Sequence, residues 1–234
     1  MASIGRLLVV TGTNGSGKTT TCKAFVDLMD ELWLHFGVDL FLGGAVPRKF
    51  VDGGPRSHEG VHMEPDDPAK SDGTRHLALG RYGMTMIQTF HAMAVAGVRA
   101  GQNIALDHVT TIDPPLLQDC VAHFKDLPVF FVGLRPPEAI IPQRIDERLE
   151  SVIKQLGREH ATRANENTKL VSKYMSAQIF SHDHFDLIVD TYAHSPAEVA
   201  AIIAREMKAR PGRAFADLAS AIKAVVPPFA SKVN

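Results

Sequence analysis

A glycine-rich octapeptide near the start of the chain constrains the fold more than any other feature. Residues 12–19 read Gly-Thr-Asn-Gly-Ser-Gly-Lys-Thr and match the pattern G-x-x-x-x-G-K-[ST] at every specified position. The octapeptide follows a short apolar run rich in β-branched residues, Leu7–Thr11, and precedes apolar residues at helical spacing. A strand, this loop and a helix together form a phosphate-binding loop (P-loop), so the sequence predicts a nucleotide site at residues 12–20.

The predicted P-loop assigns roles to its residues. Its glycines let backbone N–H groups point at phosphates, and the N-terminus of the following helix adds a favourable dipole. Lys18 is expected to reach the β- and γ-phosphates, and the Thr19 hydroxyl is expected to ligate Mg²⁺. The nucleotide-binding residues are therefore predicted to be Gly12, Thr13, Asn14, Gly15, Ser16, Gly17, Lys18, Thr19 and Thr20. A fortuitous glycine-rich turn is the alternative; a dinucleotide-binding turn would need G-x-G-x-x-G, which this loop lacks.

The rest of the chain alternates strand-like with helix-like segments. Short apolar runs at Asn103–Asp107, Val129–Gly133 and Leu187–Asp190 are predicted strands, and Trp33–Phe41 reads as a further extended run. Such alternation predicts an α/β protein with the three-layer P-loop kinase fold, a five-stranded parallel sheet with helices on both faces. The 234 residues suit one domain spanning 1–234.

Four segments are predicted to have a special character. Residues 43–76 are rich in Gly and Pro and are interpreted as an acceptor-side cap or loop. Residues 140–180 are expected to form long, lid-like helices, and 211–234 a C-terminal tail with one short helix. Ser195-Pro196-Ala197-Glu198 is a capping box that should open another helix.

Composition excludes several classes of protein. A formal net charge of −1 indicates neither non-specific nucleic-acid binding nor attraction to an anionic membrane. Two cysteines are too few for a disulfide framework, and no signal-like segment is present, so a reduced, soluble protein of the cytoplasm is expected. The guanine motif N-K-x-D of GTPases and the L-S-G-G-Q signature of transporter ATPases are both absent. A small kinase remains, with ATP or GTP preference and homo-oligomer formation left open.

Two aspartates are predicted to face the P-loop. Asp107 ends its strand at the position of a Walker B aspartate and is expected to hold Mg²⁺. Asp39 ends the predicted extended run, and the carboxyl ends of parallel strands meet in one crevice. A carboxylate there suits a group that accepts the proton of an acceptor hydroxyl. For both residues, capping of the following turn is the alternative.

Two arginines are predicted to serve the triphosphate. Arg144 and Arg148 are four residues apart, so on a helix they share one face. Arginines there would neutralise the charge that spreads over the γ-phosphoryl oxygens in the transition state. Because acidic residues are interleaved with them, a solvated, charge-paired helix is the alternative.

These residues also resemble a known family. The segment Trp33-Leu34-His35-Phe36-Gly37-Val38-Asp39 is similar to the W-L-x-F-G-V-D segment of chloramphenicol phosphotransferase and its relatives. The likeness continues at 94–107, at 131–135, and at Arg144 and Arg148. The resemblance implies a kinase that uses ATP and Mg²⁺, with Asp39 as the base for the acceptor hydroxyl. It also implies that Arg144 and Arg148 close over the nucleotide from a lid helix.

The chain departs from the family pattern where the acceptor would bind. His108 stands where the family tends to have a second Asp, and residues 43–76 are longer and more polar than the family's segment. We therefore expect an antibiotic or similar hydroxylated natural product rather than chloramphenicol in particular. The slightly acidic balance of 43–76 predicts a neutral or cationic acceptor held against Asp39. A kinase of a nucleotide sugar or nucleic-acid end, and a non-catalytic nucleotide-binding regulator, remain alternatives.

Overall fold

A parallel sheet lies between two layers of helices in the computed structural model, which describes residues 3–65, 75–156 and 158–221. The strands are β1 (Leu7–Thr11), β2 (Trp33–Gly37), β5 (Asn103–His108), β6 (Val129–Leu134) and β7 (Leu187–Val189). Their order is β2-β5-β1-β6-β7, and all described pairings in this sheet are parallel. The predicted five-stranded parallel sheet is confirmed.

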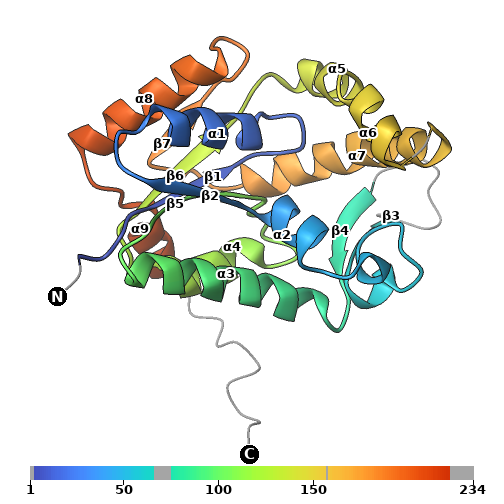
Figure 1. Ribbon diagram of the computed structural model, residues 1–234, viewed down its shortest axis with the longest axis horizontal. Helices are drawn as coiled ribbons and strands as arrows, with labels where there is room; N and C mark the ends of the chain where they lie inside the picture. Colours follow the sequence, from blue (N-terminus) through green and yellow to red (C-terminus); the bar gives the residue numbers. More distant parts are fainter. Residues whose placement is uncertain (1–2, 66–74, 157, 222–234) are drawn as a thin grey trace, which may run out of the picture.

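β1, the central strand of the sheet, contributes side chains to the cores on both faces. Leu7, Leu8, Val9 and Val10 are all fully buried, because alternate side chains enter opposite cores. One core lies under α1 (Lys18–Leu28) and α8 (Pro196–Ala209). The other lies under α3 (Gly83–Arg99), α4 (Leu116–Phe124) and α9 (Ala214–Ala221) (Figure 1). The P-loop leaves β1 at the carboxyl edge of this sheet.

The extended run predicted over Trp33–Phe41 is wrong in its second half. β2 ends at Gly37, which is paired with Asp107, and α2 (Val38–Gly44) follows at once. An extended chain beyond this last pair would leave backbone polar groups without partners, and a helix satisfies them internally. Asp39 consequently lies in the first turn of α2, where a carboxylate is favourable to the helix dipole.

The helix after the P-loop is shorter than predicted by the helical spacing of Phe25, Leu28, Met29 and Leu32. α1 ends at Leu28, and the next residue is extended, with φ −79° and ψ 135°. Its buried face consists of Lys18, Thr21, Cys22 and Phe25, whereas Leu28 is exposed. The chain must turn there to enter β2, so the later apolar residues cannot continue the helix.

The segment 43–76 contains more regular structure than a loop. Two 3₁₀ turns, Arg48–Phe50 and Ser57–Glu59, precede β3 (Val61–Pro65). β3 pairs antiparallel with β4 (Arg75–Leu79), which runs beyond the segment. The intervening residues 66–74 lie outside the described part of the chain.

The helices of the second half follow the sequence closely. Residues 140–180 hold α5 (Ile141–Asp146), α6 (Leu149–Leu156) and α7 (Arg158–Ile179). The capping box before α8 is confirmed: Ser195 Oγ accepts from the backbone of Glu198, whose Oε2 accepts from Ser195 N at 2.7 Å. The expected tail helix is α9, and residues 222–234 lie outside the described residues. No described helix combines the length and the apolar character needed to cross a membrane.

Candidate active site

The P-loop wraps around an open space at the N-terminus of α1. Gly17 caps this helix with a φ of 96°, a left-handed conformation that other residues rarely adopt. A Cβ on Gly17 would have no other atom within 4 Å, so the space in front of the helix is free. Lys18 is buried, and its Nζ donates to Gly12 O at 2.9 Å and Thr13 O at 3.0 Å. Burial lowers the pKa of Lys18, opposed by the nearby charges of Asp39 and Asp107.

Three contacts from distant segments hold the P-loop in this shape. The Thr13 hydroxyl donates to Ser172 O at 2.7 Å, and Asn14 Nδ2 donates to Met175 Sδ at 3.5 Å. On the other side, the Thr191 hydroxyl donates to Ser16 O at 2.9 Å. The loop is therefore fixed between α7 and the segment that follows β7.

Asp107 lies buried beside the P-loop with one carboxylate oxygen engaged. His35 Nε2 lies 2.8 Å from Asp107 Oδ2, while Oδ1 has no hydrogen-bond partner among the described residues. Burial alone would raise the pKa of Asp107, but the His35 hydrogen bond and the charge of Lys18 outweigh it and lower the pKa. The carboxylate is therefore ionised and has a free oxygen at the carboxyl edge of the sheet.

Gly37 lets this carboxylate approach the neighbouring strand. A Cβ on Gly37 would lie 2.7 Å from Asp107 Oδ1, too close for an ordinary contact. Sequence reasoning missed His35 and Gly37 as supports of Asp107. Their positions in a strand parallel to the one that contains Asp107 were the available signal.

Asp39 interacts electrostatically with Lys18 and Asp107. Asp39 is exposed to solvent on one side, yet the surrounding protein raises its pKa by desolvation. The positive charge of Lys18 opposes this rise, and the negative charge of Asp107 adds to it. The charges of Lys18, Asp39 and Asp107 therefore act on one another, although these residues come from α1, α2 and β5.

The oxygen donors at this edge fit a magnesium ion. Mg²⁺ prefers oxygen ligands, and the unpartnered Oδ1 of Asp107 is one. The Thr19 hydroxyl interacts with the same carboxylate and helps to lower its pKa. Thr19 and Asp107, the two metal ligands predicted from sequence, are therefore neighbours.

His108 belongs to a buried network and not to this group of oxygen donors. Its Nδ1 accepts from Val109 N at 2.7 Å, and its Nε2 lies 2.7 Å from His91 Nε2. His91 Nδ1 in turn lies 2.5 Å from Asp119 Oδ2. Burial holds the pKa of His108 well below its ordinary value, so the ring is neutral.

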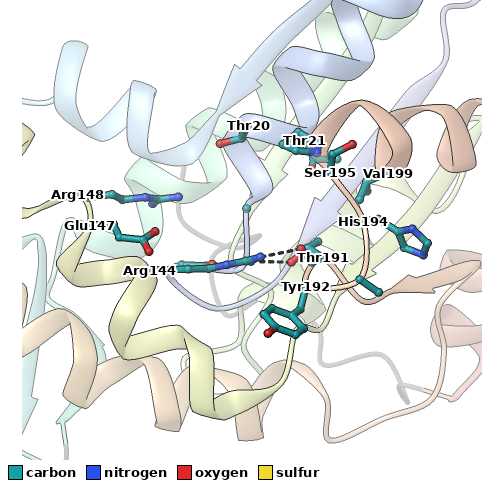
Figure 2. Close-up of a pocket in the computed structure, with 14 residues that line it drawn as sticks. Thr20, Thr21, Arg144, Glu147, Arg148, Thr191, Tyr192, His194, Ser195 and Val199 are labelled. Atoms are coloured by element: carbon teal, nitrogen blue, oxygen red, sulfur yellow. Dashed lines mark hydrogen bonds between the residues drawn. The ribbon is translucent and has the colours of Figure 1, made fainter.

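A cavity of about 480 Å³ lies beside the P-loop, and both predicted arginines line it. Arg144 donates to the Thr191 hydroxyl at 2.9 Å and to Thr191 O at 2.7 Å (Figure 2). The prediction of one shared helix face is wrong in detail, because α5 ends at Asp146 and Arg148 lies in the turn before α6. Both side chains still extend from the same side toward the P-loop (Figure 2). Neither guanidinium has an ion pair among the described residues.

The opposite wall of this cavity was missed from the sequence. It is formed by the loop after β7 and the start of α8, including Tyr192, His194 and Ser195 (Figure 2). Tyr192 is 67% exposed, which leaves its ring free to contact a ligand. The available signal was position, because this loop leaves a strand at the same edge of the sheet as the P-loop.

A second, mostly apolar cavity of about 150 Å³ lies against Asp39. Its walls come from α2, from β3 and β4, from α3 and from α7. Apolar side chains such as Leu42, Val61 and Met175 dominate it. The polar groups that line it are those of Asn14, Asp39, Asp52, His62 and His108. No described lysine or arginine lines this cavity.

Comparison with known proteins agrees with this geometry. The model of the family described as chloramphenicol phosphotransferase-like protein matches residues 5–208. Two curated relatives from Mycobacterium tuberculosis strains, both provisionally named as O-phosphotransferases, are 46% identical to the chain over 37 residues. That stretch covers 16% of this chain and 16% of each relative.

Solved structures confirm the predicted fold class. An APS kinase of Mycobacterium tuberculosis, in complex with AMPPNP and APS, is similar with a TM-score of 0.56 and 13% identity. The match covers 88% of this chain and 98% of the kinase. The tunicamycin resistance protein of Deinococcus radiodurans is similar with a TM-score of 0.51 and 14% identity, over 89% and 98% of the two chains. At these identities the likeness is one of fold alone.

Proposed function

The chain belongs to the chloramphenicol phosphotransferase-like family and is a P-loop phosphotransferase; from that premise we propose that it transfers the γ-phosphoryl group of ATP to a hydroxyl of a small molecule. One observation carries the proposal: Lys18, Asp107 and Asp39 act on one another electrostatically beside an apolar cavity. The first two suit the phosphates and the metal, and the third suits the acceptor. A reaction between two bound substrates requires that their reacting groups be held next to each other.

ATP would lie in the cavity beside the P-loop. Its phosphates would accept hydrogen bonds from the backbone of residues 12–20, and its base would lie near Tyr192 and Arg144. Arg144 is already oriented there by Thr191, which reduces the entropy lost on binding. Arg148 has no competing ion pair among the described residues and would neutralise charge on the γ-phosphoryl oxygens.

Thr19 and Asp107 would hold Mg²⁺. Bound there, the ion supplies charge neutralisation on the β- and γ-phosphate oxygens. His35 orients the Asp107 carboxylate by its hydrogen bond to Oδ2, so that Oδ1 remains available.

Asp39 would act as the base toward the acceptor. It would take the proton of the acceptor hydroxyl, whose oxygen then bonds to the γ-phosphorus as the bond to the β–γ bridging oxygen breaks. ADP and a phosphate ester leave. The raised pKa of Asp39 makes it a better proton acceptor than an ordinary aspartate. Lys18 is placed to neutralise charge on the transferring group.

The acceptor would be a neutral or cationic molecule with an apolar body, such as an antibiotic or similar natural product. Asp39 and Asp52 are the carboxyl groups that line the cavity, and no described lysine or arginine lines it. A nucleotide sugar or nucleic-acid end would bring phosphates toward these carboxylates, which disfavours that alternative. A non-catalytic regulator would have no use for a base beside an acceptor cavity.

The wider organisation follows from this assignment. We propose that 43–76 caps the acceptor, because Val51, Val61 and Met63 line the cavity. Residues 140–180 would act as the lid, within one domain over 1–234. ATP and Mg²⁺ are abundant in the cytoplasm, which is where we place the enzyme.

A screen of hydroxylated compounds tests the proposal. The full chain is incubated with Mg-ATP and each compound, and products are analysed by mass spectrometry. Gain of one phosphate, dependent on ATP and slowed by about 10²–10⁴-fold in Asp39→Asn, is the expected result. ATP binding with no phosphorylated product from any neutral or cationic alcohol would favour the regulator instead.

A further inference from the structure

A third cavity also borders the P-loop, and Tyr192 and the rest of the loop after β7 do not line it. It is lined by the end of β6, the start of α5 and the side of α7, together with Thr13 of the P-loop. We call it the α5–α7 cavity; its volume is about 220 Å³. Neither the phosphoryl transfer nor the acceptor placement uses it. We propose that the α5–α7 cavity is an effector site for a small aromatic carboxylate.

The walls of this cavity suit a flat apolar body. Leu134, Pro136, Ile141 and Phe180 supply apolar surface, and Ser172 and Ser176 supply small polar groups. A compound with a single ring fits a cavity of about 220 Å³.

The rim of the cavity selects a negative charge. Arg135, Lys169 and Lys173 line it, against one carboxylate, Glu138. Lys169 is already neutralised by Asp146 at 2.6 Å and by Glu166 at 3.0 Å. Arg135 and Lys173 form no ion pair within the described ranges. Their charges remain available to a ligand carboxylate.

Arg135 is placed to hold both parts of such a ligand. Its guanidinium lies over the ring of Phe180, 4.9 Å from the ring centroid. A second aromatic ring can pack beside Phe180 while its carboxylate receives a bidentate contact from the guanidinium.

The cavity is mechanically joined to the catalytic elements. Thr13 and Ser172 both line it and are bonded to each other at 2.7 Å. One turn along α7, Met175 contacts Asn14 of the P-loop and lines the acceptor cavity. A ligand that fills the α5–α7 cavity would hold α5 and α7 against the P-loop in the arrangement observed. It should therefore raise nucleotide affinity; this coupling, although not the binding itself, rests on the proposed nucleotide site.

Phenylacetate is a suitable probe. Titrated calorimetrically into the full chain, it should bind saturably with a Kd of about 1 mM or tighter. Saturating phenylacetate should tighten AMP-PNP binding by about fivefold, and by linkage AMP-PNP should tighten phenylacetate equally. Phenylacetamide, which has the same shape without the charge, should bind about tenfold more weakly.

Variants localise the site. Arg135→Gln and Lys173→Gln should each weaken phenylacetate about tenfold, and Ser176→Met should weaken it by filling the cavity. Lys208→Gln, an exposed lysine on α8, is the matched control and should change nothing. Absence of saturable binding, or binding that all three cavity variants leave unchanged, would overturn the site. Binding without any change in AMP-PNP affinity would overturn the effector role. These experiments measure binding and need no acceptor. A compound screen that finds no phosphorylated product would therefore not count against the effector site.

Discussion

Replacement of Gly37 by alanine should damage catalysis far more than folding. The added Cβ would lie 2.7 Å from Asp107 Oδ1, whereas ordinary contact begins at 3.4 Å. The carboxylate must therefore move by about 0.7 Å. It cannot do so freely, because His35 holds Oδ2 at 2.8 Å. The displaced oxygen is the one we assign to Mg²⁺.

The magnitudes of the two effects differ. Misplacement of a catalytic group by ~1 Å costs about 10²-fold, so a shift of this size should lower kcat by about tenfold to a hundredfold. The backbone of Gly37, at φ −105° and ψ 144°, is open to alanine, so no conformational strain is added. Overpacking costs about 1–3 kcal/mol, and the stiffer unfolded chain recovers about 0.4–1 kcal/mol. The net loss of about 0–2.6 kcal/mol lowers Tm by at most about 10 °C.

The assay measures phosphoryl transfer at a series of Mg²⁺ concentrations, with thermal unfolding recorded in parallel. Gly37→Ala should need more Mg²⁺ for half-maximal rate. Gly43→Ala is the matched control, because a Cβ at Gly43 would have no other atom within 4 Å. A folded Gly37→Ala enzyme with wild-type rate and wild-type Mg²⁺ requirement would refute the placement of the metal at Asp107.

Substitutions at three further residues separate the roles of the site residues. Lys18→Ala should remove nearly all turnover while the protein still unfolds cooperatively; a variant that keeps a tenth of the wild-type rate would contradict the P-loop assignment. Asp39→Asn should lose about 10²–10⁴-fold in kcat with near-normal AMP-PNP affinity by calorimetry. Because desolvation raises the folded-state pKa of Asp39, its ionisation destabilises the fold as pH rises. Asp39→Asn should therefore have the higher Tm at pH 8, with a difference that fades toward pH 4; a lower Tm at pH 8 would indicate a structural role. His35→Phe should raise the Mg²⁺ requirement, and His35→Gln, which can still donate to Asp107, should restore part of it; equal effects of both would argue against orientation by a hydrogen bond.

Local patterns in the sequence were sufficient for the P-loop, the sheet and the main helices. The run Leu7–Thr11 is mainly apolar because both faces of this strand are buried. The octapeptide that follows it matches the P-loop pattern at every specified position. Ser195 and Glu198 specify the start of α8 through bonds between near neighbours. Such features depend on residues within a few positions of one another.

The rest depends on contacts that no local pattern carries. The change from strand to helix at Gly37 depends on the pairing of β2 with β5, whose last residue pair is Gly37 and Asp107. The hydrogen bond between His35 and Asp107 joins residues 72 positions apart. α4 and the hairpin of β3 and β4 were missed for a related reason: they pack on a core assembled from several distant segments. The roles of Asp39, Arg144 and Arg148 remain predictions; Asp39 interacts electrostatically with Lys18, and both arginines line the cavity beside the P-loop.

The anchoring of the P-loop has a consequence for protein synthesis. The octapeptide leaves the ribosome well before the residues that hold it, because Thr13, Asn14 and Ser16 are bonded to Ser172, Met175 and Thr191. β1 likewise pairs with strands that appear only at residues 103 and 129. A nascent chain therefore carries the phosphate-binding residues long before they have a fixed shape. ATP, although present throughout translation, should select and stabilise only chains in which residue 191 has emerged and docked.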